Sequence, residues 1–408
     1  MRIEFSPPDI TEAEIQAVAE TLRSGWITTG PRTKQFEREL AEWCQTPRVA
    51  CLNSATAALE CVLKLLGIGE GDEVITSAYT YTASASVICH VGATPVLLDT
   101  APGSYEMDYS LLTKAVTPRT KAIIPVDIAG VMCDYETLFA QLEQLKERFL
   151  PTSGTLQELF DRVVVVADAA HSFGATRLGR PSGSVADFTA FSFHAVKNLT
   201  TAEGGALTWR PRQGLDNDAL YHEIMLYSLH GQSKDALSKS EAGAWEYDIV
   251  APLYKCNMTD IFAALGLAQL QRYSQILARR RVIFERYVDA LESDEVEFIR
   301  HFTSEGSSNA HLCLVRLPGK DEAFRNQFIR DMGKREVACN VHYKPLPLLA
   351  AYKNLGFRTE DFPHALAQYQ CEVTLPLHSK LSDEEVDYVI EAFKAAYNEL
   401  SASKAYNS

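Results

Sequence analysis

Short runs of β-branched and aliphatic residues alternate with helix-like segments from about residue 50, and this alternation constrains the fold more than any other feature. Several runs are apolar at every position, as is typical of strands covered by helices on both faces of a sheet. The pattern is that of βαβ units and predicts an α/β domain with a mainly parallel central sheet. We expect its strands at residues 73–76, 94–98, 121–126, 163–167, 188–192 and 206–209.

The chain of 408 residues is too long for one small core, so we expect two domains. An N-terminal arm and the large domain are placed at residues 1–258, and a smaller C-terminal α/β domain at residues 259–408. In the latter the pattern predicts a long helix at residues 260–293 and a strand at residues 311–316. A capping box at residues 382–385 predicts the start of the last helix.

Two segments differ in composition from the rest. Residues 134–161 are helical in periodicity before Pro151, and we expect a surface crossover made of an amphipathic helix, a turn and a second short helix. Residues 231–247 are rich in Gly, Ser and Lys and predict a long loop.

The charge and the cysteines exclude several classes of protein. A net charge of −14 argues against non-specific binding to nucleic acids or anionic membranes. The first residues lack an apolar signal core, and no apolar run is long enough to span a bilayer. The nine cysteines occur singly without a CxxC pair, so we expect buried thiols, no zinc site and no disulfide framework. These features predict a cytoplasmic protein without a metal.

A lysine follows the strand predicted at residues 188–192, within the segment FSFHAVKNLTTAEGG. Its small and polar neighbours predict a tight loop from which Lys197 reaches the floor of a pocket. Partial desolvation lowers the pKa of a lysine amine and frees its lone pair for Schiff-base chemistry. On its own such a lysine is more often a surface cation, so its interpretation depends on the residues around it.

The strand predicted at residues 163–167 is followed by Asp168 and, three residues later, by His171. Ligands bind at the carboxyl ends of the strands in open α/β sheets. A carboxylate at that edge can keep a pyridine nitrogen protonated, and the histidine can hydrogen-bond the phenolic oxygen of the same ring. A helix N-cap is the alternative for Asp168 and a hydrogen-bonded core histidine the alternative for His171.

A helix that begins near Ala55 and Thr56 has small residues in its first turn. Free backbone N–H groups at a helix start bind phosphate, and the hydroxyl of Ser192 could join them. Tyr81 follows another predicted strand and could stack on a flat cofactor ring, although a tyrosine at the rim of the core is the alternative.

Taken together, these segments resemble the sugar aminotransferases of the DegT/DnrJ/EryC1/StrS family, which have the fold-type I pyridoxal-phosphate (PLP) architecture. The resemblance runs over nearly the whole chain and depends on the order and spacing of its motifs. The motifs lie at residues 24–31, 53–56, 71–76, 92–95, 118–126, 168–171, 191–197, 202–205, 257–260, 263–266 and 342–345.

The resemblance implies a role for each matching residue. It makes Lys197 the Schiff-base lysine and general base, and Asp168 the partner of the pyridinium nitrogen. The remaining positions expected to bind the cofactor are Ala55, Thr56, Tyr81, His171, Ser192 and Asn257. The asparagine matches one that the family contributes from the neighbouring subunit, which implies a homodimer with shared active sites. Substrate contacts are expected from Trp26, Thr28, His342 and Tyr343.

The segments at residues 24–31, 168–171 and 191–198 most resemble the branch that aminates UDP-4-keto-pentoses, the UDP-4-amino-4-deoxy-L-arabinose aminotransferases. The implied reaction moves an amino group from L-glutamate to a nucleotide-linked keto-sugar. Asp127 and Pro347 stand where many relatives have His, and Cys256 stands where an aromatic residue is common.

Two alternatives remain at this point. One is a PLP-dependent deoxysugar dehydratase, in which the family replaces the lysine with histidine. The other is a catalytically silent PLP- or sugar-sensing homologue. Regulators of this kind usually carry an added DNA-binding domain, for which neither the sequence nor its acidic charge gives support.

Overall fold

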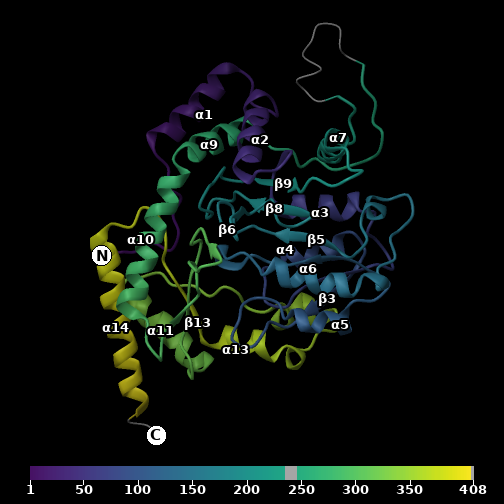
Figure 1. Cartoon of the computed structure of the whole chain (residues 1–408). Coiled ribbons are helices and arrows are strands. Elements are labelled where there is room, and N and C mark those ends of the chain that lie inside the picture. The colour runs from purple at the N-terminus through teal and green to yellow at the C-terminus, as the bar shows by residue number, and fades with distance from the viewer. Residues whose placement is uncertain (235–245, 406–408) are drawn as a thin grey trace.

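The computed structural model describes residues 1–234 and 246–405, and its centre is a seven-stranded sheet with the order β1-β9-β8-β5-β4-β2-β3 (Figure 1). All strand pairs are parallel except the two that β9 makes with β1 and β8. The strands are β1 (Val49–Leu52), β2 (Glu73–Ser77), β3 (Thr94–Leu98), β4 (Thr120–Ile124), β5 (Val164–Asp168), β8 (Phe188–Ser192) and β9 (Gly205–Trp209). The fold class predicted from the sequence is confirmed.

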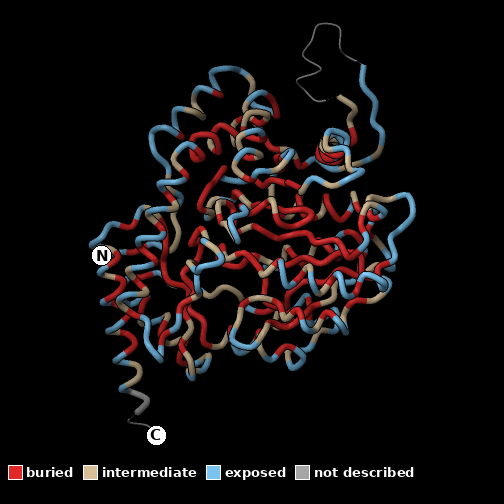
Figure 2. Tube along the Cα trace, in the orientation of Figure 1, coloured by how far each residue is buried: buried red, intermediate tan, exposed pale blue. Residues whose placement is uncertain are grey.

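Helices cover both faces of this sheet, and alternate residues of a strand therefore enter different cores. In β1, Ala50 and Leu52 belong to one buried cluster, whereas Val49 and Cys51 belong to another. Side chains of a strand point alternately to the two faces, so both faces are closed from solvent. Figure 2 shows the resulting continuous band of buried chain through the sheet.

The helices of the large part of the fold surround the sheet. They are α1 (Glu12–Ser24), α2 (Pro31–Cys44), α3 (Ala55–Leu65), α4 (Ala83–His90), α5 (Leu112–Ala115), α6 (Tyr135–Gln144), α7 (Asn217–Ser228) and α9 (Asp260–Gln271). The next helix, α10 (Tyr273–Leu291), follows α9 and packs Ile283, Phe284, Tyr287 and Leu291 into a second hydrophobic core.

The helix predicted at residues 260–293 is wrong as one element, because the chain breaks at Arg272 into α9 and α10. The guanidinium of Arg272 donates to Glu14 of α1 at 2.6 Å, whereas the hydroxyl of the next residue, Tyr273, donates to the carbonyl of Phe173 at 2.6 Å. Because these two neighbouring residues are bonded to different elements, the helix ends at Arg272 and a new helix begins at Tyr273.

A second core lies around a three-stranded sheet with the order β10-β12-β13. Its elements are β10 (Glu297–Phe298), β12 (Cys313–Arg316), α11 (Glu322–Lys334), α12 (Ala350–Asn354), α13 (Pro363–Cys371), β13 (Glu372–Leu375) and α14 (Asp383–Ala405). The predicted capping box is present, since Glu385 N donates to Ser382 Oγ at 3.1 Å and Ser382 N donates to Glu385 Oε2 at 2.8 Å. Ile3 also packs in this core, so the N-terminal arm reaches both parts of the fold. The domain division at residue 258 stays a prediction.

The strand predicted at residues 311–316 begins only at Cys313. The backbone N–H groups of His311 and Leu312 donate to the carbonyl of Ala129 instead of to a sheet neighbour. A third small sheet, β11-β6-β7, joins Gly306–Ser307 to Thr176–Arg177 and Arg180–Pro181 and has no counterpart in the sequence-based expectations.

The crossover at residues 134–161 contains α6 and, after a turn, a 3₁₀ helix at Leu156–Leu159, as predicted. Most of the loop predicted at residues 231–247 lies outside the described residues.

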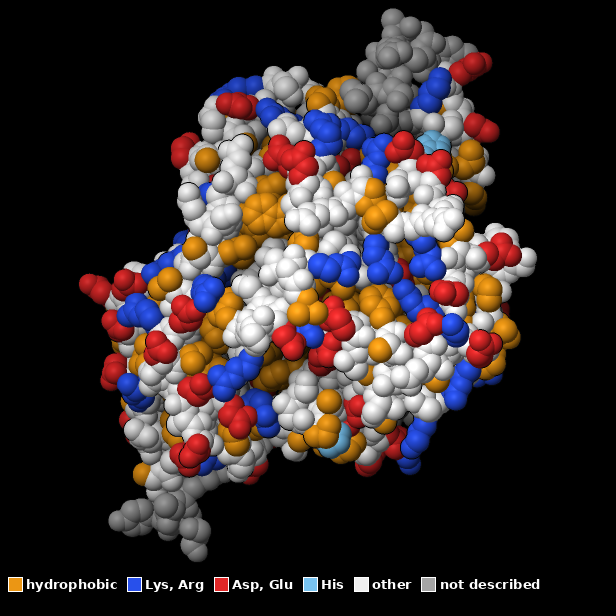
Figure 3. Space-filling view, in the orientation of Figure 1, with side chains coloured by type: hydrophobic (Ala, Val, Ile, Leu, Met, Phe, Trp, Pro, Cys, Tyr) orange, Lys and Arg blue, Asp and Glu red, His pale blue; other side chains and the backbone are white. Residues whose placement is uncertain are grey.

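Seven of the nine cysteines are buried and all nine are free. No helix in the described ranges is long and apolar enough to cross a membrane. On the face shown in Figure 3, basic and acidic side chains are interspersed.

Candidate active site

The carboxyl ends of β1, β2, β4, β5 and β8 meet at one edge of the sheet and surround a cavity of about 380 Å³. The strand directions explain this convergence, because parallel strands deliver the residues that follow them to the same edge. Eight of the residues singled out from the sequence line the cavity: Ala55, Thr56, Tyr81, Asp168, His171, Ser192, Lys197 and Tyr343.

Lys197 is half-buried in the loop after β8, and its backbone N–H donates to the carbonyl of His194 at 2.9 Å. Within the described part of the chain its ammonium forms no hydrogen bond or ion pair. Burial lowers the pKa of Lys197 to about 8, while the carboxylate of Asp168 opposes this change. The fraction of neutral amine near physiological pH is therefore far higher than for an ordinary lysine, although the ammonium still predominates, and the neutral amine is the form that nucleophilic chemistry requires.

Asp168 is the last residue of β5 and is 5% exposed. Its carboxylate accepts from the hydroxyl of Ser84 at 2.6 Å and from the backbone N–H of Ala170 at 3.2 Å. Burial raises the pKa of Asp168, and the bond from Ser84 lowers it. No helix begins after this residue, so the N-cap alternative is wrong. In the described ranges no cation lies in ion-pair contact with the carboxylate, which leaves it able to face a cationic ligand.

His171 lies opposite, with its two ring nitrogens in defined roles. Its Nδ1 accepts from the backbone N–H of Ala129 at 3.2 Å, so the proton of the neutral ring must be on Nε2. That N–H is 3.1 Å from the hydroxyl oxygen of Tyr343. Burial lowers the pKa of His171 well below its ordinary value, so the ring is a neutral donor at pH 7. The ring of Tyr81 lies 5.8 Å from that of Tyr343 and forms part of the mouth.

The start of α3 forms the other wall of the cavity. Ser54 caps the helix by accepting from Ala57 N at 3.1 Å, which leaves the N–H groups of Ala55 and Thr56 without an acceptor in the described part of the chain. Gly205 of β9 lies so close that a Cβ there would be 2.4 Å from Ala55 N. The glycine therefore allows the helix start to border the cavity beside the end of β8.

These features fit PLP. Lys197 offers an unpaired amine, Asp168 a buried carboxylate for a ring cation, and the first turn of α3 free donors for a phosphate. Each matches one functional group of that cofactor, and all three face one cavity.

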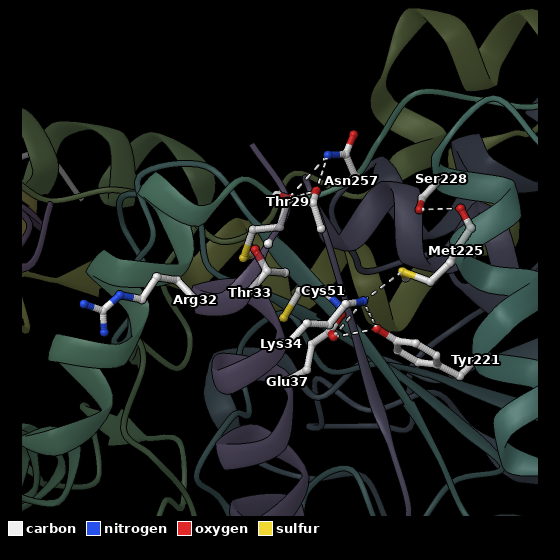
Figure 4. Close-up of polar contacts among 12 residues, drawn as sticks. Thr29, Arg32, Thr33, Lys34, Glu37, Cys51, Tyr221, Met225, Ser228 and Asn257 are labelled. Carbon is white, nitrogen blue, oxygen red and sulfur yellow. Dashed lines mark hydrogen bonds and ion pairs between the residues drawn. The ribbon is translucent and has the colours of Figure 1, made fainter. Parts of the chain in front are cut away.

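Four residues expected from the sequence do not line this cavity: Trp26, Thr28, Asn257 and His342. The amide of Asn257 donates to Thr29 Oγ1 at 2.5 Å, and Figure 4 shows the two side chains facing each other. Trp26 Nε1 donates to the carbonyl of Thr29 at 3.2 Å. His342 packs behind the cavity, stacked on Phe5 with ring centroids 5.6 Å apart.

Thr28 accepts the backbone N–H of Asp260 through its carbonyl at 3.1 Å. It therefore belongs with Trp26 and Asn257 to one group of contacts at the start of α9, outside the cavity.

Sequence reasoning missed Ser84, which bonds Asp168 from the first turn of α4. Thr80, whose hydroxyl is 2.8 Å from that of Ser84, extends this chain of hydroxyls. Their position after β2 was an available signal, because that strand end was already expected at the ligand edge.

The carboxylate of Asp127 accepts hydrogen bonds from Cys133 N, Tyr135 Oη and Ser172 Oγ at 2.9, 2.9 and 2.6 Å.

Comparison with known proteins agrees with this geometry. The model of the DegT/DnrJ/EryC1/StrS aminotransferase family matches residues 8–394. The spore coat polysaccharide biosynthesis protein SpsC of Bacillus subtilis is 39% identical over 394 residues, or 96% of each chain.

Two solved structures extend the comparison. "Putative sugar aminotransferase Spr1654" of Streptococcus pneumoniae, solved in apo, PLP and PMP forms, is 53% identical in its PMP form with a TM-score of 0.95, covering 99% of this chain and 100% of that one. PseC of Helicobacter pylori, an aminotransferase involved in the biosynthesis of pseudoaminic acid, is 25% identical with a TM-score of 0.85 over 98% of this chain and 100% of its own.

Proposed function

We propose that this chain moves an amino group from L-glutamate to a nucleotide-linked keto-sugar. The chain belongs to the DegT/DnrJ/EryC1/StrS aminotransferase family and is a PLP-dependent sugar aminotransferase. The observation that carries the proposal is the unpaired amine of Lys197, which shares one cavity with the cation-free carboxylate of Asp168. The product is an amino-sugar for surface polysaccharide, lipid or secondary-metabolite glycosylation.

The bound cofactor supplies a protonated ring that stabilises the electron pair left when a proton is removed from the carbon bearing nitrogen. Lys197 Nζ would hold the cofactor, and its amine, once free, would act as general base and general acid for that proton. Asp168 keeps the ring nitrogen protonated, aligned by Ser84. His171 would donate its Nε2 proton to the ring oxygen, Tyr81 would lie against the ring, and the first turn of α3 with Ser192 would hold the phosphate.

Relatives support the sugar substrate. SpsC is described as a spore coat polysaccharide biosynthesis protein, and PseC acts in the biosynthesis of pseudoaminic acid. For the sugar itself we propose a UDP-4-keto-sugar, on the motifs at residues 24–31, 168–171 and 191–198 shared with the UDP-4-keto-pentose branch. The lysine at position 197 argues against a dehydratase, because the dehydratases of the family carry histidine there. Substrate contacts are proposed for Trp26, Thr28, His342 and Tyr343.

We propose a cytoplasmic homodimer that completes its two sites across the interface. Ile249, Val250 and Tyr254 are 47%, 57% and 46% exposed on the segment that leads to Asn257. Apolar side chains gathered on one segment support a protein interface. In the proposed dimer, Asn257 and Trp26 contact the cavity of the partner subunit. This arrangement accounts for their position outside the cavity of their own chain.

The test follows the absorbance of the purified protein. With PLP bound, a visible band is expected that bleaches to a near-ultraviolet band on addition of L-glutamate. A panel of UDP-, dTDP- and GDP-keto-sugars is then screened for return of the visible band. Return with a UDP-4-keto-sugar supports the proposal, whereas bleaching without return by any member of the panel would contradict the nucleotide-sugar substrate. Sedimentation of wild type and Ile249→Asp tests the dimer.

A further inference from the structure

A short segment that precedes β12 reaches from the second core to the back of the cavity. It consists of Asn309, Ala310 and His311, and all three residues are buried. Arg280 of α10, only 3% exposed, holds it in place by donating to the carbonyls of Ala310 at 3.0 Å and His311 at 2.6 Å. Two hydrogen bonds from one buried guanidinium therefore fix the backbone of this segment to α10.

The segment contacts the residue beside the candidate cofactor lysine. Asn198 is 8% exposed, and its Nδ2 donates to the carbonyl of Asn309 at 2.8 Å. That carbonyl can only accept, so the amide oxygen of Asn198 must face His311 Nδ1, 3.0 Å away. His311 Nδ1 consequently carries the proton and donates it to Asn198.

The same segment contacts His171 on two sides. The rings of His311 and His171 lie with centroids 4.4 Å apart, and Asn309 Nδ2 donates to the carbonyl of His171 at 2.6 Å. His311 N also donates at 3.0 Å to the carbonyl of Ala129, the residue whose own N–H sets the tautomer of His171. A Cβ at the neighbouring Gly130 would lie 1.9 Å from Asn309 Oδ1, so the approach is close.

We infer that His311 and Asn198 are positioning residues that hold the loop of Lys197 and the ring of His171 at a set separation. Each of the two cavity residues lies on a loop after a different strand, so one side chain that contacts both loops can fix the separation between them. One imidazole hydrogen-bonds the first loop and packs on the second. The inference rests on the proposed function, in which both loops contact the same cofactor.

Two substitutions of His311 separate its hydrogen bond from its ring. His311→Phe keeps a ring against His171 and removes the donor to Asn198, whereas His311→Asn places an amide N–H near the former Nδ1. We expect the dissociation constant for PLP to rise about five- to tenfold in His311→Phe, the loss of one net hydrogen bond, and to lie within about twofold of wild type in His311→Asn.

His301→Phe is the matched control. This buried imidazole bonds Ser308 at 2.7 Å and the carbonyl of Leu312 at 2.9 Å, so its loss destabilises the same region without touching the loops of Lys197 or His171. We expect it to lower the unfolding temperature and leave PLP binding unchanged. Asn198→Ala, which removes the acceptor, replaces His311→Phe should that variant not fold.

Equal PLP affinity in His311→Phe and wild type would overturn the inference, as would equal weakening in His301→Phe or failure of His311→Asn to rescue binding. PLP titration and unfolding need no sugar substrate. A failed keto-sugar assay would therefore count against the proposed substrate and leave this result intact.

Discussion

The two ends of the central sheet differ in whether a buried aspartate has cationic partners. At the amino end, Asp187 before β8 is bonded by Arg162 at 2.7 Å, by Arg210 at 2.9 Å and by the N–H of Val165 at 2.9 Å. At the carboxyl end, Asp168 has one hydroxyl and one N–H, and no ion pair in the described part of the chain.

The lysines follow the same division. Lys121 at the amino end is 7% exposed and donates to the carbonyls of Pro118 and Leu150. Lys197 at the other end forms no such bond within the described residues. Partnered charges serve stability, whereas a charge left without its complement is available to a ligand. The charges without partners therefore support the carboxyl end as the ligand site, whereas the partnered charges at the amino end stabilise the fold.

Removing the two lysines sharpens this contrast most strongly. Lys197→Ala is expected to lower the rate of amino transfer by about 10³-fold or more and to abolish the visible band of the bound cofactor, because it removes both nucleophile and base. Lys121→Ala should keep the band and the rate and unfold at a lower temperature, since two carbonyls lose their donor. Absorbance spectra and thermal unfolding are measured for both variants. Full turnover by Lys197→Ala would contradict the assignment of Lys197 as the Schiff-base lysine.

The two aspartates form the second test. Asp168→Asn is expected to reduce the rate about 10²- to 10³-fold with a folded structure, because the ring cation loses its counter-charge. Asp187→Asn should cost about 3–5 kcal/mol of unfolding free energy, because it leaves two arginines without their buried partner. Steady-state kinetics and denaturant titration measure the pair. An Asp168→Asn variant that loses stability and keeps its rate would contradict the assignment of Asp168 to the site.

Ser84→Ala should have a smaller effect, about five- to tenfold in rate, through one hydrogen bond. The hydroxyl of Ser84 lowers the pKa of Asp168, so its removal raises that pKa. The acid limb of the pH–rate profile should therefore move to higher pH. An acid limb at the wild-type position would show that the bond has no role in tuning the carboxylate.

The smallest effect concerns stability and pH in the apoprotein. Burial lowers the pKa of Lys197 from 10.5 to about 8, so between these values the unfolded chain binds more protons and wild-type stability rises with pH. Below pH 8 the cost of burying the ammonium is present in full. Lys197→Met should therefore unfold at a higher temperature than wild type at pH 7, with the difference shrinking toward pH 10.5. A constant difference across this range would contradict the shifted pKa.

Sequence patterns located the strand ends well and the contacts between distant segments poorly. Asp168 and Ser192 end β5 and β8 at the cavity, as apolar runs followed by polar residues indicate. The break at Arg272 was not foreseen, since the helical periodicity continues through it. Ser84 was missed because its place after β2 was the only signal, and a serine in the first turn of a helix is common.

The 309–311 segment shows why such contacts escape a reading of the sequence. Its partners Asn198 and His171 are more than a hundred residues away, and the approach depends on left-handed backbone at Ala129, with φ of 56°. Nothing local to His311 distinguishes it from His301, which is equally buried and belongs to the core.

The amino-acid sequence by itself determined the parallel sheet and the edge at which its chemistry lies, because strand periodicity and chain direction are local properties that repeat along the chain. Only the tertiary structure decided which charges lack partners, which nitrogen of His171 carries the proton, and that Asn257 bonds Thr29 and does not line the cavity. Those outcomes depend on distances between segments far apart in sequence, and such distances are set by packing alone.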